Sequence, residues 1–392
     1  MKILIHMGDS FFDHCPNSKR MNSFTEAFNK AEYEVSVISP REKLKEEPKH
    51  IKYLPCPMLA KNKKSSLMRL VSQFSFAFNS LFVALRAGKV DVVITTSPPA
   101  LISPAGWLIS KFKRAKLIYD VRDIWPDVAL EMGSFQKGSI YERLFRFVRD
   151  FMLKRADLVT AVSPGKVKKL SDYKHKSDVL LIANGFDKNF LENTIDEKII
   201  EQYRLNNKFS CVYVGKLGLA QGLNQLLNIA ERAKNNDIDA QFLLFGSGVE
   251  EKLLKNIVEE KRLDNVIFCG IIPNSKIFTI LNNVDMCFVP LVNKNLSDSV
   301  PTKLYEALGV GCPVLLSACG DAADILNQTG LGVAVTPNDD DELWKAFCDM
   351  YRKSDWGVNK EKAIRLMNTT FSRECSAEIL VNEISKRFIK GE

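Results

Sequence analysis

The sequence lacks the cysteine spacings that hold metal ions or carry out redox chemistry. None of its nine cysteines forms a Cys-x-x-Cys pair, and most lie in apolar runs typical of strands. An odd number of scattered cysteines favours buried, reduced thiols over a disulfide framework. We therefore expect a cytoplasmic protein with no metal site and no cofactor.

Long apolar segments are also missing. The opening residues, MKILIHMGDSFF, reach His6 and Asp9 before an apolar core of about 7–15 residues can form, which argues against a signal peptide. No uninterrupted apolar run reaches the about 18 residues expected of a membrane-spanning helix. Low-complexity tracts and fixed-period repeats are absent as well. A globular chain of 392 residues remains, long enough for two domains.

Charge is unevenly distributed along the chain. Residues 1–190 carry 32 Lys and Arg against 19 Asp and Glu, a net charge of +13, whereas the remainder has a net charge of −5. A basic half indicates an anionic partner. From charge alone, the alternatives are a phospholipid surface, a diphosphate-bearing molecule and nucleic acid. A lysine-rich solvated surface with no partner is an equal alternative.

The order of apolar runs predicts an α/β fold. Short β-branched runs at 90–97, 115–121 and 156–163 alternate with segments of helical length, which is typical of a parallel sheet covered on both faces. The pattern restarts at 209–217. We therefore predict two Rossmann-like, doubly wound lobes with a cleft between them, at 1–190 and 205–374. An amphipathic helix at about 375–392 is expected to pack back on the first lobe.

Two stretches of the second lobe suit a phosphorylated ligand. In 215–227 a strand leads through Gly215 and Lys216 into a helix, and such a loop offers backbone amides to a diphosphate. In 295–317 a helix is predicted to begin at Pro301, with Asp298 before it and Glu306 two turns in. Carboxylates there can accept hydrogen bonds from sugar hydroxyls. Ordinary loop glycines and a capped surface helix are the alternatives.

In the first lobe, the segment YDVRDIWPD ends a predicted strand, where catalytic groups lie in open α/β sheets. Asp120 or Asp123 could orient or deprotonate an acceptor hydroxyl, and a structural ion pair beside Arg122 is the alternative. Gly8 and His14, in or near the first βα loop, are further candidates for contact with an acceptor.

These motifs resemble a known family. GKLGLAQGL, LLFGSG, NVIFCG and VPTKLYEALGVGCPVL, in this order, are similar to the donor lobe of retaining glycosyltransferases of family 4, which have the GT-B fold. TTSPPALISPAGWLISK and LIYDVRDIWPDVALEMG resemble the subgroup that transfers N-acetylfucosamine in bacterial O-antigen and capsule synthesis. The resemblance implies a nucleotide-sugar donor and a polyprenyl-diphosphate-linked saccharide acceptor, with no metal ion and no nucleic acid.

Carried onto this sequence, the family's two motif acids fall on Asp298 and Glu306, and its diphosphate-gripping pair falls on Lys216 and Gln221. The sequence thus departs from the family at two positions. Asp298 is shorter than the family's glutamate, and Gln221 lacks the positive charge of the family's residue. Lys303 is a candidate for supplying that charge instead. Position at a strand end for Asp120 and Asp123, and the family motif for Asp298, make these three the expected catalytic residues. The resemblance implies donor contacts from Gly215, Lys216, Gln221, Gly246, Ile272, Ser299, Lys303 and Glu306, and acceptor contacts from Gly8, His14 and Arg122.

The sequence leaves two questions open. A nucleotide-sugar epimerase of the same fold and a non-catalytic nucleotide-binding subunit are the alternatives to a transferase. The segment 61–89 combines lysines with phenylalanines on more than one helical face. We hypothesise that it docks on the inner, anionic face of a membrane, and a helix buried against the sheet is the alternative.

Overall fold

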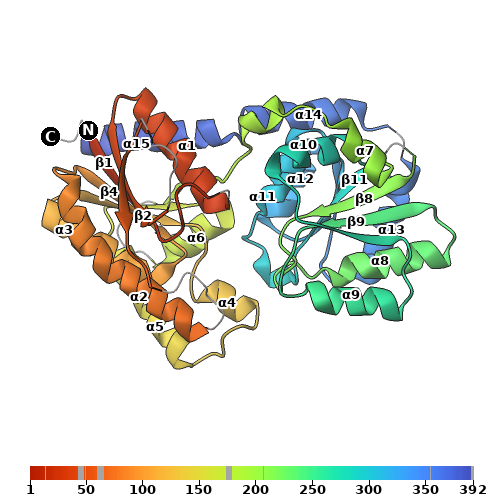
Figure 1. The fold of residues 1–392 in the computed structure, drawn as a ribbon, viewed down its shortest axis with the longest axis horizontal. Coiled ribbons are helices and arrows are strands. Elements are labelled where there is room, and N and C mark those ends of the chain that lie inside the picture. Colours follow the sequence, from red (N-terminus) through yellow and green to blue (C-terminus); the bar gives the residue numbers. More distant parts are fainter. Residues whose placement is uncertain are drawn as a thin grey trace. The chain divides into compact units, whose positions relative to one another are not determined.

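The computed structural model describes residues 1–13, 15–42, 48, 50–59, 66–173, 179–205, 207–353 and 355–389. The chain divides into two compact units, each with its own parallel sheet (Figure 1). The first unit is Met1–Asn184 together with Arg373–Glu392, and the second is Gly185–Ser372. The predicted α/β fold with two Rossmann-like lobes is confirmed. All nine cysteines are free thiols.

The first unit has a seven-stranded sheet of order β3-β2-β1-β4-β5-β6-β7, in which every pairing is parallel. Its strands are β1 (Lys2–His6), β2 (Glu34–Pro40), β3 (Lys52–Cys56), β4 (Val92–Ser97), β5 (Lys116–Val121), β6 (Leu158–Ala161) and β7 (Val179–Leu181). Its helices are α1 (Pro16–Lys30), α2 (Ser66–Val83), η1 (Ala84–Ala87), η2 (Ala100–Ile102), α3 (Ser103–Lys113), α4 (Asp127–Glu131), α5 (Ile140–Arg155), α6 (Pro164–Tyr173) and α15 (Arg373–Phe388).

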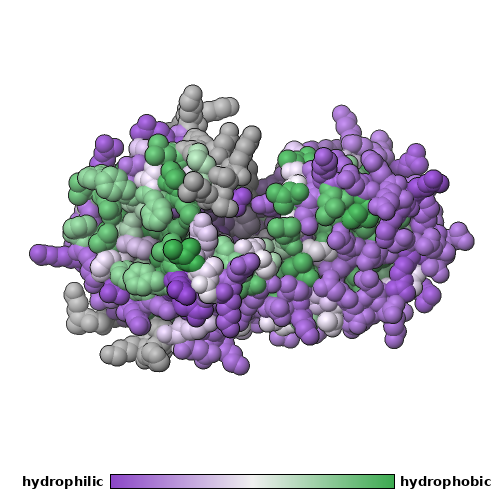
Figure 2. All heavy atoms as spheres, turned by 90° about the horizontal axis from the view of Figure 1, so that it is seen from below, coloured by the Kyte–Doolittle hydropathy of each residue, from purple (hydrophilic) through white to green (hydrophobic). Residues whose placement is uncertain are grey.

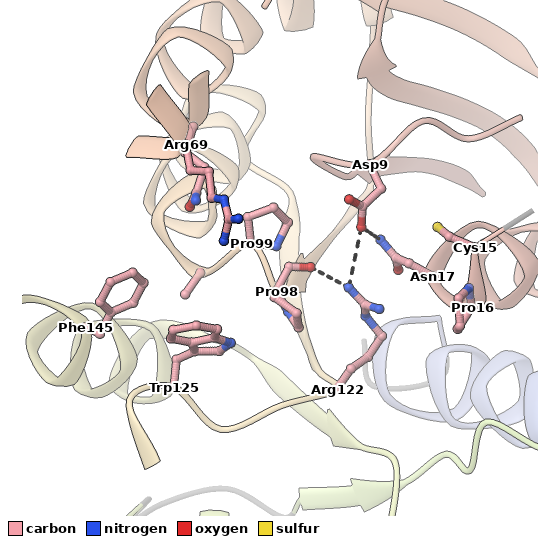
Figure 3. A pocket seen from close by; sticks show the side chains of 12 residues that line it. Asp9, Cys15, Pro16, Asn17, Arg69, Pro98, Pro99, Arg122, Trp125 and Phe145 are labelled. Carbon is pink, nitrogen blue, oxygen red and sulfur yellow. Dashed lines mark hydrogen bonds and ion pairs between the residues drawn. The ribbon is translucent and has the colours of Figure 1, made fainter. Parts of the chain in front are cut away.

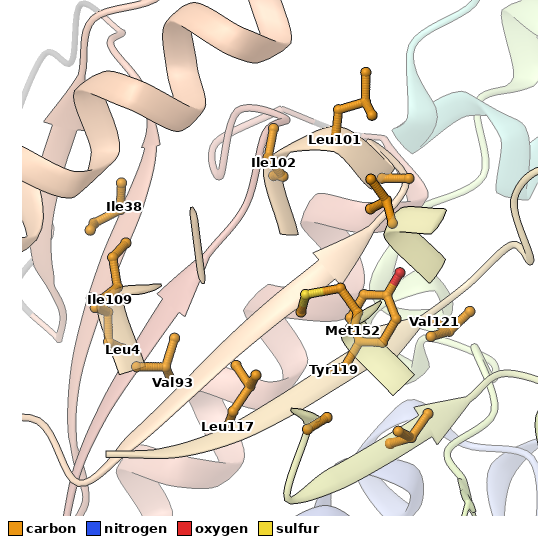
Figure 4. Packing of buried hydrophobic residues seen from close by; sticks show 14 of the residues in the cluster. Leu4, Ile38, Val93, Leu101, Ile102, Ile109, Leu117, Tyr119, Val121 and Met152 are labelled. Atoms are coloured by element: carbon orange, nitrogen blue, oxygen red, sulfur yellow. The ribbon is translucent and has the colours of Figure 1, made fainter. Parts of the chain in front are cut away.

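Two helical layers cover this sheet because successive strand residues point to opposite faces. Leu4, Val93 and Leu117 face a core completed by α2, α3 and α5 (Figure 4). Ile3, Ile5 and other residues of alternate register face a core completed by α1 and α15. Helix α15 therefore packs against α1, far from it in sequence.

Helix α2 is long and apolar by composition. By length and composition alone, Met68–Ala87 is a candidate membrane span, although the uninterrupted-run criterion misses it. Only 28% of this stretch is buried. Phe76, Val83 and Ala84 nevertheless belong to the core of the first unit, so we treat α2 as a helix of that unit with one exposed face.

The second unit has a six-stranded parallel sheet of order β10-β9-β8-β11-β12-β13. Its strands are β8 (Phe209–Val214), β9 (Ala240–Phe245), β10 (Val266–Gly270), β11 (Met286–Pro290), β12 (Val314–Ser317) and β13 (Gly332–Val335). Its helices are η3 (Lys188–Glu192), α7 (Glu197–Tyr203), α8 (Asn224–Asn235), α9 (Glu251–Glu260), α10 (Asn274–Asn283), η4 (Lys294–Leu296), α11 (Thr302–Gly309), α12 (Asp321–Thr329), α13 (Asp340–Arg352) and α14 (Gly357–Asn368).

Candidate functional site

The loops that follow β8 and β9 pack backbone to backbone. A Cβ atom on Gly246 would lie 1.8 Å from the carbonyl oxygen of Gly215, and the two residues have φ angles of +140° and +146°. The Leu217 N–H donates a hydrogen bond to the Ser247 carbonyl at 2.9 Å. Only glycine suits both positions, so the predicted phosphate-binding loop is held in one conformation at the carboxyl end of the sheet.

Lys303 brings a positive charge to this loop. Its Nζ lies 3.8 Å from the centre of the Tyr213 ring, and a Cβ on Gly215 would lie 2.9 Å from the same Nζ. Burial lowers the pKa of Lys303 to about 7, and the negative charge of Glu306 acts in the opposite direction. Gly215, Gly246, Lys303 and Glu306, predicted from separate motifs, are thus brought together.

The approach to α11 differs slightly from the prediction. The helix begins at Thr302, and Pro301 is its extended N-cap residue rather than its first helical residue. Asp298 is only 6% exposed, and the backbone N–H of Ser299 donates to the Leu296 carbonyl at 3.0 Å. The Asp298 carboxylate is therefore largely enclosed, one turn of chain before the helix.

The remaining predicted donor contacts differ in their surroundings. Lys216 is exposed, and its carbonyl accepts a hydrogen bond from the Tyr213 hydroxyl at 2.7 Å. The Gln221 side-chain oxygen lies over Gly218, where a Cβ would be 3.0 Å away. Ile272 is half-buried in the loop between β10 and α10. In this unit, sequence reasoning missed Tyr213, although its place two residues before Gly215 is a signal.

In the first unit, Asp120 is enclosed in a buried ion pair. Its Oδ1 accepts from Arg20 Nη2 at 2.8 Å and from Thr160 Oγ1 at 2.6 Å, and its Oδ2 accepts from Arg20 Nε at 3.2 Å. Burial alone would raise the pKa of Asp120, but Arg20 outweighs it and the pKa is lowered. The side chain is 0% exposed, so in this structure the carboxylate is closed to an acceptor, contrary to the expectation from the sequence.

Asp123 and Arg122 lie beyond the end of β5. Asp123 is half-buried, and no hydrogen bond or ion pair to it is found within the described part of the chain. The Arg122 guanidinium donates to Thr96 Oγ1 at 3.2 Å and to the Pro98 carbonyl, and it lies 3.7 Å from Asp9. Of the two aspartates, Asp120 and Asp123, only Asp123 therefore has a carboxylate available to a substrate.

Arg122 also lines a cavity of about 380 Å³ in the first unit (Figure 3). The predicted Gly8 is not among the lining residues but lies against one of them, because an added Cβ would be 3.0 Å from Pro99. His14 lies outside the described residues. The sequence did not single out the other residues that line the cavity, which are Asp9, Cys15, Pro16, Asn17, Arg69, Gln73, Pro98, Pro99, Ala100, Trp125 and Phe145.

The chain matches two family models. Residues 18–185 match the glycosyl transferase 4-like domain, and residues 195–364 match the glycosyl transferases group 1. Each match falls almost entirely within one structural unit. Both models describe glycosyl transferases, which favours sugar transfer over the epimerase alternative.

Similar proteins support the same conclusion. A protein of Escherichia coli K12 named as the colanic acid biosynthesis glycosyl transferase WcaI is 25% identical over 298 residues, 72% of each chain. Sucrose-phosphate synthase of Thermosynechococcus elongatus has a TM-score of 0.82 at 17% identity over the whole of both chains. HepE of Anabaena, solved with UDP-glucose, has a TM-score of 0.74 at 16% identity and covers 98% of this chain and 100% of its own. The two solved structures indicate the GT-B fold.

Proposed function

Because this chain belongs to the nucleotide-sugar-dependent glycosyltransferases of family 4, with the GT-B fold, we propose that it builds a bacterial surface polysaccharide. In this proposal it moves a sugar, an N-acetylated deoxyhexosamine, with retention of anomeric configuration. The acceptor is a polyprenyl-diphosphate-linked saccharide. The enzyme acts in the cytoplasm, at the inner face of the membrane.

The contact between Lys303 and Gly215 is the observation that carries the proposal. A diphosphate at the Gly215 loop would meet a lysine ammonium and the N-terminal end of α11, both of which favour negative charge. Lys216 adds a second, exposed cation. Glu306 and Asp298 are carboxylates that can accept hydrogen bonds from the hydroxyls of the donor.

In the reaction we propose, the bond between the anomeric carbon and the diphosphate oxygen breaks as the acceptor oxygen bonds to that carbon. Asp123 takes the acceptor's hydroxyl proton. Lys303 and Lys216 stabilise the charge on the departing diphosphate without a metal ion. Arg20 and Asp120 act indirectly by holding α1 to the end of β5.

A panel of nucleotide sugars tests this function. Each donor is incubated with the full chain, with and without a polyprenyl-diphosphate saccharide, and products are identified by mass spectrometry. We expect one donor to give an extended lipid-linked saccharide only when the acceptor is present. Conversion of donor alone into an isomer would instead identify an epimerase, and no conversion of any donor would contradict the proposal.

The pKa of Lys303 predicts how donor binding depends on pH. Both phosphates of a nucleotide sugar are esterified and keep their charge near neutrality, so the protein supplies the titrating group. With a pKa of about 7, the ammonium form falls from about 90% at pH 6 to about 10% at pH 8. We expect calorimetry to show affinity falling roughly tenfold over this range.

Two variants distinguish the contribution of Lys303 to donor affinity from that of Lys216. Lys303→Met is expected to bind weakly, with the pH dependence removed. Lys216→Met serves as the matched control and should weaken binding at every pH while keeping the slope. A wild-type affinity that does not change between about pH 6 and pH 8 would show that Lys303 is not the cation that grips the diphosphate.

The exposed face of α2 supports the membrane part of the proposal. Val71, Phe74, Phe78 and Phe82 of α2, followed by Leu85 of η1, are each 40–70% exposed. Helix α3 packs against α2, and α5 against α3, and they add the exposed Phe112 and Phe147. Figure 2 shows apolar side chains gathered over the first unit, on the left of the view. So many exposed aromatic side chains are typical of a surface that meets lipid.

Vesicle sedimentation checks this surface. The triple variant Phe74→Ser, Phe78→Ser, Phe82→Ser should reduce binding to anionic phospholipid vesicles at least about tenfold, since each phenylalanine contributes apolar burial. The control removes exposed apolar residues of the second unit, Ile271→Ser and Val358→Ser, which are 79% and 82% exposed. Equal binding by both variants, or no wild-type binding at low salt, would contradict membrane docking.

A further inference from the structure

One buried tyrosine of the second unit contacts both lysines of the proposed diphosphate site. Tyr213 is the last residue but one of β8, and its side chain is 0% exposed. The centre of its ring lies 3.8 Å from Lys303 Nζ, and its hydroxyl donates to the Lys216 carbonyl at 2.7 Å. The tyrosine is closed to a donor in this structure, so any effect on the donor passes through its neighbours.

The ring holds the Lys303 ammonium beside the loop. No hydrogen bond or ion pair to Lys303 is found within the described part of the chain. Glu306 lies three residues further along α11, where side chains are neighbours, so a rotation of the lysine stem can bring the ammonium to that carboxylate instead. The negative face of the tyrosine ring attracts the ammonium and competes with Glu306. The charge is thereby kept next to Gly215, where a Cβ would lie 2.9 Å from Nζ.

The hydroxyl holds the backbone of the second lysine. The Lys216 carbonyl also accepts from the Gly218 N–H at 3.1 Å, which closes a tight turn. Burial raises the pKa of Tyr213 above its ordinary value, so the phenol keeps its proton and remains a donor. The Lys216 side chain is exposed and has no hydrogen bond or ion pair to another described residue. Its direction therefore depends on the backbone that the Tyr213 hydroxyl fixes.

The core of the second unit fixes the tyrosine itself. Tyr213 belongs to a cluster of buried residues that includes Leu217, Leu223 and Phe288. A Cβ on Gly215 would lie 3.3 Å from the Tyr213 hydroxyl, so the loop backbone also lies against the side chain. A ring in such close-packed surroundings keeps one orientation, and it can therefore hold both contacts at once.

We propose that Tyr213 is a positioning residue that sets the place of both lysines, a role that rests on the proposed diphosphate site. Its ring holds the Lys303 ammonium beside the loop, and its hydroxyl holds the backbone from which Lys216 extends. Both cations are then in place before the donor arrives, so less conformational freedom is lost on binding.

Two substitutions of Tyr213 distinguish its two contacts. Tyr213→Phe keeps the ring and removes the hydroxyl, and donor affinity should fall about 3- to 10-fold, the usual effect of one lost hydrogen bond. Tyr213→Leu also removes the ring and should weaken binding by a further factor of about 2 to 30, the range for a lost contact between a cation and an aromatic ring. Calorimetry on the full chain measures both losses. The probes are UDP-glucose, dTDP-glucose and GDP-glucose, and the one that binds the wild type most tightly is used throughout.

Double variants show whether each loss passes through the expected lysine. In a Lys216→Met background, Tyr213→Phe should cost no further affinity, whereas in a Lys303→Met background it should cost as much as in the wild type. In the Lys303→Met background, Tyr213→Leu and Tyr213→Phe should bind equally. A purely structural role would give the same loss in every background, and that result would contradict the proposal. If Tyr213→Leu does not fold, Tyr213→Phe and its two double variants still decide the question.

The pH dependence of affinity provides a second readout. The groups that face Lys303 are Glu306 of the same helix, Cys287 of β11 and the Tyr213 ring of β8. Because the ring favours the ammonium form, Tyr213→Leu should move the midpoint of the affinity change from about pH 7 to lower pH, by about 0.4 to 1.5 pH units. Tyr213→Phe keeps the ring and should keep the wild-type midpoint.

Tyr351 provides the matched control. It is half-buried on α13, and its ring packs on Phe209 at the other end of β8, with centroids 4.7 Å apart. Tyr351→Phe and Tyr351→Leu should leave donor affinity unchanged even where they lower stability. Wild-type affinity in both Tyr213 variants, or equal losses in the Tyr351 variants, would overturn the positioning role and leave the diphosphate site standing. No binding of any probe to the wild type would overturn the diphosphate site, and the positioning role with it.

Discussion

Alanine at Glu306 is expected to reduce kcat/KM by about 10²- to 10⁴-fold while the protein stays folded. A carboxylate that accepts two hydrogen bonds from a donor contributes about 1.5–3 kcal/mol for each of them. The substitution also affects Lys303, because the negative charge of Glu306 raises the pKa of that lysine. Without Glu306 less of the ammonium form remains at neutral pH.

Steady-state kinetics with the donor identified by the panel measures this loss. Glu306→Gln keeps an accepting oxygen and should fall between the wild type and alanine. Glu259→Ala, an exposed acid on α9 of the same unit, should have wild-type activity. Near-normal turnover by a folded Glu306→Ala protein would reject the donor site around α11.

Asparagine at Asp120 is expected to destabilise the first unit by about 3–5 kcal/mol. The substitution keeps the size of the side chain but leaves the Arg20 guanidinium, 2% exposed, without a counter-charge. Urea unfolding followed by tryptophan fluorescence measures the change. Trp107 and Trp125 report on the first unit, and Trp344 and Trp356 on the second, so only part of the signal should shift to lower urea.

A surface ion pair provides the control for Asp120. Asp157 lies 3.3 Å from Lys116 with both side chains partly exposed, and Asp157→Asn should change stability by no more than about 1 kcal/mol. Because folding lowers the pKa of Asp120, its stabilisation is present above the unfolded pKa of about 4 and is lost as pH falls below it. The gap between wild type and Asp120→Asn should therefore narrow in acid. Coincident unfolding curves at neutral pH would contradict the ion-pair role.

The features that sequence predicted best are those fixed by local pattern. The strands expected at 90–97, 115–121 and 156–163 are β4, β5 and β6, because parallel strands buried on both faces read as continuous apolar runs. Strand β3 was missed. It is an edge strand that contains Pro55, which weakens the pattern that identifies a strand.

The features of the site that the sequence could not show depend on contacts between segments far apart in the chain. Asp120 reads as a free carboxylate at a strand end until Arg20, 100 residues earlier, is seen to enclose it. The cavity joins Asn17 of α1, Gln73 of α2 and Trp125 of the loop before α4, and no local pattern links them. Gly246 was predicted, but the reason it must be glycine is the backbone of Gly215.

Helix α15 has a consequence for the order in which the protein folds during synthesis. The first unit emerges from the ribosome first, yet its core lacks Ala377, Leu380 and Ile384 until the last helix is made. The second unit, translated later, has all of its strands and helices by Ser372 and can complete its core earlier. A chain that stalls before α15 would leave the sheet face beside α1 uncovered, so the segment made first is the last to complete its core.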